Sequence, residues 1–320
     1  MAGAGGLGGG RSQLTATPFG HGAGTPFGHG AGTPFAQLSG SLLPRCTFPP
    51  PGTPVTCAVS GGADSLALLL LAHVAGCAAT AVHVDHGLRP GSAAEADLVA
   101  RVAGDLDVAF RAERVTVDPG PNLEARARAA RLAVLPPEVL TGHTADDQAE
   151  TVLLNLLRGA GLDGLAGMSP ARHPVLGLRR TETRALVAAA GLCPVDDPSN
   201  ADPAFRRNRV RSEVLPLLDD VAQRDVAGVL ARQAAILRDE AVLLDSLAAS
   251  LDATDARAVA AAPAPLARRA LRRWLTTGRD HPPSGAAVDR VLDVARGTCR
   301  ATEVDDGRRV SRTAGRLRLE

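Results

Sequence analysis

Short apolar runs rich in β-branched residues alternate with longer Ala- and Leu-rich segments from residue 54 onward. Runs at 55–60, 79–86, 108–117 and 138–144 predict strands, and the segments at 65–75, 93–106, 122–135 and 145–159 predict helices. Strands that alternate with helices at this spacing predict an α/β fold with a doubly wound parallel sheet. Ligands of such sheets bind beyond the carboxyl ends of the strands.

The pattern changes in the C-terminal third of the chain. A helix at 181–190 is followed by an irregular polar stretch, a long amphipathic segment at about 221–251, and shorter helices. Turn signals at Asp306-Gly307 and Ala314-Gly315 predict a small terminal β-meander. We therefore expect an α/β domain at 46–215 and a mostly helical, arginine-rich domain at 216–320.

The N-terminal segment, residues 1–45, has a different composition. It contains TPFGHGAG twice in tandem and then TPFAQ, and it carries too little apolar surface to fold by itself. It lacks the features of a secretory signal or a transit peptide. We predict a disordered, low-complexity leader with no amphipathic helix before the first strand.

Charge and cysteine content indicate the type of partner and the cellular compartment. All 35 basic residues are arginine, and residues 205–320 hold 21 of them against 16 acidic residues, an excess that suits a polyanionic partner or a solvated helix face. The five cysteines are scattered, which favours a reducing compartment without a disulfide or zinc framework. No apolar run is long enough to span a bilayer, so we expect a cytoplasmic protein.

The turn between the first strand and its helix reads Ser60-Gly61-Gly62-Ala63-Asp64-Ser65, without a lysine. Backbone amides at a helix start carry unpaired donors and partial positive charge, so a glycine-rich turn can hold phosphate without a cationic side chain. Ser60 and Ser65 add hydroxyl donors, and Asp64 is a candidate ligand for Mg²⁺. The alternative is a tight turn with a helix cap and no ligand.

The string S-G-G-x-D-S resembles the phosphate loop of the N-type ATP pyrophosphatases, or PP-loop enzymes. Four further motifs, HVDHGLR, HTADDQAET, LLRGAGLDGLAGM and DPSNADPAFRRNRVRSEVLP, extend the likeness to the tRNA(Ile)-lysidine synthetases over about 54–216. That resemblance implies ATP and Mg²⁺ as cofactors, and a tRNA(Ile) with a CAU anticodon and free L-lysine as partners. It also implies adenylation of the wobble cytidine at O2, attack of the lysine amine at C2, and release of pyrophosphate and AMP.

The resemblance also implies roles for particular residues. The nucleotide site would include Ser60, Gly61, Gly62, Ala63, Asp64, Ser65, His83, His86, Arg89 and His143. The catalytic residues would be Asp64, Arg128, Asp147 and Glu150. Asp147 and Glu150, three apart on one helix face, would also bind substrate together with Arg207, Asn208 and Arg209 from the basic cluster 206–211.

Plainer interpretations stay open for several of these residues. Carboxylates such as Asp147 and Glu150 also complement a helix dipole, and His83 can be a satisfied core histidine. The alternative functions are another PP-loop enzyme that modifies tRNA or forms an amide, and a nucleotide-binding module without turnover. The oligomeric state is open, with a homodimer as one option.

Overall fold

The computed structural model describes residues 32–85, 92–116, 126, 129–130, 133–196, 202–279 and 281–320. The chain divides into two compact units, Met1–Leu154 with Met168–Ala231 and Asn155–Gly167 with Arg232–Glu320. The first unit therefore extends past the boundary predicted at residue 215. The second unit takes in a short internal segment that the sequence analysis assigned to the α/β domain.

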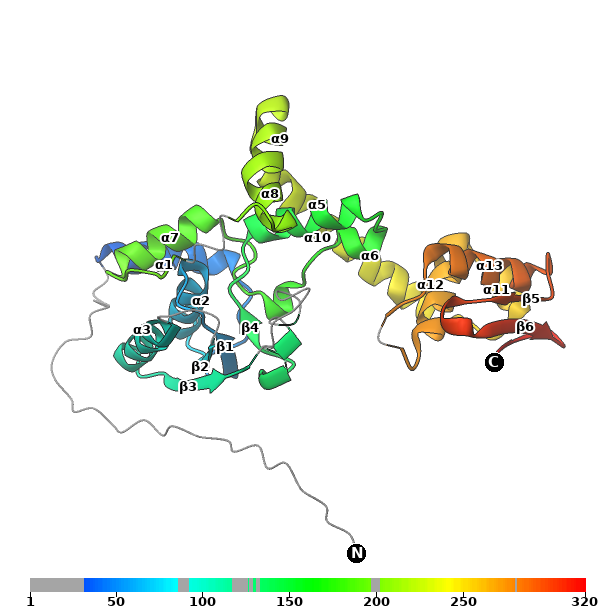
Figure 1. The fold of residues 1–320 in the computed structure, drawn as a ribbon, viewed down its shortest axis with the longest axis horizontal. Helices are drawn as coiled ribbons and strands as arrows, with labels where there is room; N and C mark the ends of the chain where they lie inside the picture. Colours follow the sequence, from blue (N-terminus) through cyan, green and yellow to red (C-terminus); the bar gives the residue numbers. More distant parts are fainter. Residues whose placement is uncertain are drawn as a thin grey trace, which may run out of the picture. The chain divides into compact units, whose positions relative to one another are not determined.

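A four-stranded parallel sheet forms the centre of the first unit (Figure 1). Its strands are β1 (Pro54–Ala58), β2 (Ala78–Asp85), β3 (Ala109–Arg114) and β4 (Leu140–Thr141). Their order is β3-β2-β1-β4, and all three pairings are parallel, which confirms the predicted α/β class. Because β2 and β4 flank β1 on opposite sides, the topological switch point lies between β1 and β4, where a ligand is expected.

The helices of the first unit bury the sheet and build its polar edge. They are α1 (Pro34–Leu42), α2 (Ala63–Val74), α3 (Ser92–Asp105), α5 (Ala145–Leu157), α7 (Arg180–Ala189), α8 (Arg206–Arg209) and α9 (Leu215–Ala222). Every residue of α2 from Ser65 to Ala72 is buried, as expected for a helix that is apolar all round. Helix α7 packs against α2, and this contact brings the first turn of α7 to the phosphate-loop turn.

The predicted disordered leader is wrong for its last part. Pro34–Leu42 form α1, whose Phe35 and Leu42 are 4% exposed and belong to the main core. Thr33 caps this helix through its side chain, and Pro34 occupies the first helical position, where a proline is favoured. The third TPF copy is followed in the sequence by apolar residues at helical spacing, Leu38 and Leu42, whereas GHGAG follows the first two copies.

Helices and a small sheet make up the second unit. Its elements are α6 (Leu162–Leu165), most of α10 (Val226–Ala249), α11 (Ala256–Ala261), α12 (Ala264–Thr276), α13 (Gly285–Arg296), β5 (Ala301–Glu303), β6 (Arg309–Thr313) and β7 (Arg316–Leu319). The three strands pair antiparallel in sequence order, which confirms the predicted β-meander. The predicted helical segment at 221–251 is interrupted at Gln223, whose φ of 51° is left-handed. No helix among the described residues is long and apolar enough to cross a membrane.

Candidate active site

The turn from β1 into α2 has the form of an anion cradle. Gly61 has a φ of +82°, which L side chains rarely adopt, and Gly62 caps α2 with extended backbone. The Ser65 hydroxyl accepts from the Ser60 amide at 3.1 Å and donates to the Gly62 carbonyl at 2.8 Å. Ser65 therefore closes the turn from inside, and the first-turn amides of α2 are of the kind that can bind an anion.

Gly142 brings the end of β4 against this turn. A Cβ at Gly142 would collide with the Asp64 carbonyl and lie 2.9 Å from the Ser65 nitrogen. Only glycine permits this approach, so the loop that leads into α5 contacts the first turn of α2. The sequence analysis did not single out Gly142, because its reason lies in a contact across the sheet edge.

The acidic pair predicted on α5 lies on one face of that helix. Asp147 Oδ2 accepts from both the amide and the hydroxyl of Thr144, at 2.8 and 2.9 Å, and so caps the helix start. Asp147 is 8% exposed and Glu150 is 0% exposed. Asp147 has Oδ1 left for other partners, whereas Glu150 is fully enclosed.

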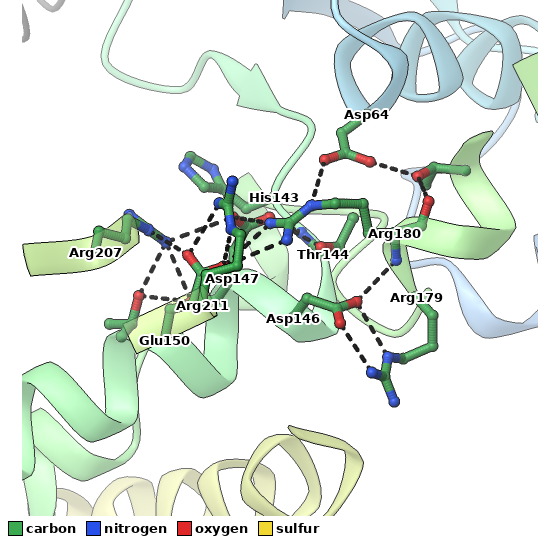
Figure 2. A network of polar contacts seen from close by, with 12 residues as sticks. Asp64, His143, Thr144, Asp146, Asp147, Glu150, Arg179, Arg180, Arg207 and Arg211 are labelled. Carbon is green, nitrogen blue, oxygen red and sulfur yellow. Dashed lines mark hydrogen bonds and ion pairs between the residues drawn. The ribbon is translucent and has the colours of Figure 1, made fainter. Parts of the chain in front are cut away.

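Three arginines converge on this pair (Figure 2). Arg207 Nε lies 2.6 Å from Glu150 Oε2, and Arg211 Nε lies 2.7 Å from Glu150 Oε1. Arg180 Nη2 donates to Asp147 Oδ1 at 2.9 Å and lies 3.3 Å from Glu150 Oε1. Arg207 and Arg211 are four residues apart, on α8 and on the π-helical turn Val210–Val214 that follows it. Arg207 was a predicted substrate-binding residue and Arg211 belongs to the predicted basic cluster 206–211, whereas Arg180 was not predicted.

Arg180 also joins the acidic pair to the phosphate-loop turn. Its Nε lies 3.4 Å from Asp64 Oδ2, while the Thr183 hydroxyl donates to Asp64 Oδ1. Figure 2 shows the Arg180 guanidinium between Asp64 on α2 and Asp147 on α5. The sequence analysis missed Arg180, since a single arginine stands out little in a chain whose basic residues are all arginine.

The electrostatic setting of the carboxylates differs. Burial, and then the neighbouring Asp147 carboxylate, raise the pKa of Asp64 in spite of its bonds to Thr183 and Arg180. Burial by itself would raise the pKa of Asp147, but Arg180, His143 and Arg207 outweigh it and lower that pKa. Asp147 is thus held as an anion, whereas an added cation beside Asp64 would oppose the rise of its pKa.

Asp146 forms a separate ion pair beside the site. Its Oδ1 accepts from Arg179 Nη2 at 2.8 Å, and its Oδ2 accepts from the Arg180 backbone amide at 2.8 Å. Arg179 also contacts Asp225 through Nη1. These bonds fix the start of α7, and with it the backbone from which the Arg180 side chain projects.

The three described histidines near the site have different roles. The Thr141 hydroxyl, at the end of β4, lies 2.7 Å from His143 Nδ1 and 2.6 Å from His173 Nδ1. His173 was not predicted. His83 is 2% exposed, with Nδ1 2.9 Å from the Val59 carbonyl. This burial and this contact fit the alternative of a satisfied core histidine, and the Val59 carbonyl lies directly before the phosphate-loop turn.

The remaining predicted site residues lie either on α8 or outside the described residues. Asn208 is buried and donates to the Asp202 carbonyl at 2.9 Å, which orders the loop before α8. Arg209 is exposed and pairs with Glu213 one turn later, at 2.8 Å. Neither side chain joins Arg207 on the acidic pair. His86, Arg89 and Arg128 lie outside the described residues.

These residues fit a nucleotide with Mg²⁺. The first turn of α2 offers backbone donors for phosphate, and Asp64 offers a carboxylate beside them. Within the described parts of the chain, no group of three His, Cys, Asp or Glu side chains can hold a metal ion. A magnesium ion would therefore depend on Asp64 together with phosphate oxygens, and it would neutralise charge on the phosphates.

Comparison with known proteins agrees with this arrangement. Residues 44–218 match the family model for the PP-loop domain. The tRNA(Ile)-lysidine synthase of Nocardia farcinica is 46% identical over 263 residues, which cover 76% of this chain and 83% of that protein. The tRNA(Ile)-lysidine synthase of Rhodococcus opacus is 46% identical over 243 residues, covering 70% and 74%. A solved structure, the U34-tRNA thiolase NcsA of Methanococcus maripaludis, has a TM-score of 0.50 at 15% identity over 64% of this chain and 80% of that one, which indicates a shared fold alone.

Proposed function

Because the chain belongs to the tRNA(Ile)-lysidine synthase family of PP-loop enzymes, we propose that it joins free L-lysine to C2 of the wobble cytidine in a CAU-anticodon tRNA(Ile). As a member of this family it is an ATP-using ligase. One observation carries the proposal: a single side chain, Arg180, contacts both Asp64 of the phosphate-loop turn and the acidic pair Asp147 and Glu150. The proposed phosphate site, which binds an anion, and the proposed amine site, which binds a cation, are thus adjacent.

The proposed chemistry has two steps. Cytidine O2 attacks the α-phosphorus of ATP and pyrophosphate leaves; the lysine ε-amine then attacks C2 and AMP leaves with that oxygen. The first step converts a poor leaving group into a good one, and the wobble base must be splayed out of the anticodon loop to reach the site. The α2 first-turn amides would hold and orient the phosphates for the displacement, and Asp64 would contribute as a ligand of Mg²⁺ beside them.

The acidic pair is the proposed site of the lysine ammonium. Asp147 offers Oδ1 as the contact atom, and Glu150 adds negative charge from a fully buried position. A carboxylate selects the cationic form of the amine, which must lose a proton before it attacks. Arg207 is also a proposed substrate-binding residue, since its bond to Glu150 places it beside the acidic pair.

The second unit is the proposed tRNA-binding part. Several arginines of α12 have internal partners: Arg268 pairs with Asp289, Arg269 bridges Asp163 and Asp245, and Arg273 donates to the Ala248 carbonyl. These residues stabilise the unit, so phosphate contacts are assigned instead to exposed arginines of the β-meander, Arg309 and Arg318. Because ATP and tRNA are the proposed substrates, we place the activity in the cytoplasm.

Incorporation of labelled lysine tests the function directly. The purified full chain is incubated with ATP, Mg²⁺, labelled lysine and a transcript of tRNA(Ile) bearing CAU, and acid-precipitable label is counted. Pyrophosphate release is followed in parallel, with lysine or tRNA omitted in turn. Stable lysine incorporation that requires ATP and the CAU transcript is the expected result. Pyrophosphate release without incorporation would indicate another PP-loop reaction, and neither signal would indicate a binding module.

Two substitutions test the parts of the site. Asp64→Asn removes the carboxylate beside the phosphate cradle, so pyrophosphate release should fall by 10²-fold or more, an order of magnitude typical for loss of a charge-stabilising group. Replacement of Arg309 and Arg318 by Gln should weaken tRNA binding and flatten its salt dependence while ATP affinity stays unchanged. An unchanged salt dependence would show that these two arginines are solvated and make no phosphate contacts.

A further inference from the structure

Arg180 lies where three carboxylates meet. Its guanidinium contacts Asp64 through Nε, Asp147 through Nη2, and Glu150 through both Nη atoms, at distances of 2.9–3.4 Å. The side chain is 18% exposed, so much of its charge is removed from water. A cation held by carboxylates from two different elements, at the edge of a substrate site, occupies the position that a cationic substrate would need.

The carboxylates and guanidiniums of the ion-paired cluster balance in charge without any ligand, before the further positive contribution of His143 at Asp147 is counted. Asp64, Asp147 and Glu150 supply three negative charges, and the guanidiniums that contact them, Arg180, Arg207 and Arg211, supply three positive ones. An incoming ammonium would add a positive charge to a balanced cluster, and mutual repulsion in a partly buried site is costly. Departure of one guanidinium would restore the charge balance when an ammonium enters.

The contacts distinguish Arg180 from the other two arginines. Arg207 and Arg211 hold Glu150 at 2.6 and 2.7 Å, whereas Arg180 lies 3.3–3.4 Å from Glu150 and from Asp64, and only its bond to Asp147 is short. If Arg180 moved away, Glu150 would keep two arginines, and Asp147 Oδ2 would keep both bonds to Thr144. Asp147 Oδ1 would lose its short bond to Arg180 and keep only longer contacts to Arg207 and Arg211, at 3.6 and 3.8 Å.

We propose that Arg180 is a place-holder for the substrate ammonium, that ATP phosphates draw it away, and that lysine binding is thereby made dependent on ATP. This inference rests on the proposed function, since it takes lysine as the amine bound by Asp147. Arg180 already reaches Asp64 in the first turn of α2, so phosphates held at that turn would attract its guanidinium at short range. Its backbone is fixed by the bond to Asp146, so a change of side-chain rotamer suffices.

The consequence is a coupling between two ligands. A nucleotide that removes Arg180 from Asp147 lowers the free energy of lysine binding, and by reciprocity lysine strengthens nucleotide binding by the same factor. Coupling of this kind orders the reaction, because the nucleophile is held only when the activating nucleotide is present. A purely structural role for Arg180 would change stability and leave the coupling factor unaltered.

Calorimetric titration of lysine measures this factor on the full chain. The titration is run with and without α,β-methylene-ATP and Mg²⁺, an analogue that resists cleavage at the α–β bond. For the unchanged protein we expect lysine to bind about tenfold more tightly with the analogue. In Arg180→Gln we expect tight binding without nucleotide, and a further gain of no more than about twofold with it. Arg180→Lys, which keeps a positive charge, should retain most of the coupling.

Arg184→Gln is the matched control. Arg184 lies on the same helix with 64% of its side chain exposed, and its replacement removes the same charge away from the site. It should bind lysine like the unchanged protein, with the same dependence on the analogue. Circular dichroism and thermal melts confirm that each variant is folded before its titration is compared.

Three outcomes would overturn the inference. One is a lysine affinity of the unchanged protein that does not respond to the analogue, a result that needs no variant to fold. Another is Arg180→Gln with an unchanged coupling factor or with weaker lysine binding in both states. Either of these two results, with lysine still bound, would refute the place-holder role of Arg180 and leave the proposed function standing. Absence of lysine binding in every variant, with no lysidine formed, would refute the proposed substrate and the inference together.

Discussion

Glu150→Gln tests whether the buried carboxylate of α5 stabilises the fold or binds substrate directly. Glu150 is 0% exposed, and its two oxygens accept from three arginines, with Arg207 at 2.6 Å and Arg211 at 2.7 Å as the closest. Glutamine preserves the shape but removes the charge and replaces one acceptor by an NH₂ donor. That donor would face guanidinium N–H groups, so at least two charge-assisted hydrogen bonds are lost.

The expected cost is large because the site cannot rehydrate. Each lost hydrogen bond to a charged group costs about 1.5–3 kcal/mol, and removal of one partner from a buried ion pair costs about 3–5 kcal/mol. We therefore expect the free energy of unfolding to fall by about 3–5 kcal/mol. For a unit of this size, each kcal/mol corresponds to roughly 2–4 °C, so the melting temperature should fall by about 6–20 °C.

Differential scanning calorimetry and urea titration of the full chain measure the loss, with the transition of the first unit fitted separately. Glu213→Gln is the matched control, since Glu213 makes an ion pair with Arg209 at 2.8 Å in an exposed position. Its melting temperature should stay close to that of the unchanged protein, because exposed pairs contribute little. The reasoning is refuted if Glu150→Gln loses less than about 1 kcal/mol while the KM for lysine rises tenfold. Glu150 would then be a direct ligand of the amine.

Three other predictions concern separate features. Asp147→Asn should raise the KM for lysine about tenfold with ATP binding little changed, because a charge-assisted contact worth about 1.5–3 kcal/mol is lost. Unaltered lysine kinetics would show that Asp147 only caps the helix. Glu182 sits in partial burial, which alone would raise its pKa, but Arg45 and the Arg179 amide lower the pKa below its ordinary value of 4.5. Its ionised form therefore stabilises the fold above that pH. The difference in melting temperature between Glu182→Gln and the unchanged protein should be full at pH 7 and shrink below pH 4.5. A difference that persists at low pH would exclude the ion pair as its cause. Phe35→Ala should destabilise the first unit by about 3–5 kcal/mol by urea titration, because its ring is 4% exposed in the main core; a change under 1 kcal/mol would show that α1 contributes little.

The local features of the site could be predicted from the sequence alone. The phosphate-loop turn, the individual strands and the shared face of Asp147 and Glu150 all depend on residues within a few positions of one another. Backbone sterics, helix periodicity and turn chemistry act over that range, so a short string such as Ser60–Ser65 determines its own geometry. The terminal β-meander was predictable for the same reason, from two turn signals.

Tertiary structure alone decided which arginines contact the carboxylates of the candidate site and which glycine permits the approach of β4 to α2. Arg180 lies 116 residues from Asp64 and 33 from Asp147, and Gly142 is required only because the end of β4 meets the first turn of α2. In a chain whose basic residues are all arginine, the sequence does not distinguish an arginine buried among carboxylates from a solvated one. Both have the same residue type and similar neighbours in the sequence. Burial and partner choice are properties of packing between distant segments, and they become visible only when those segments are brought together.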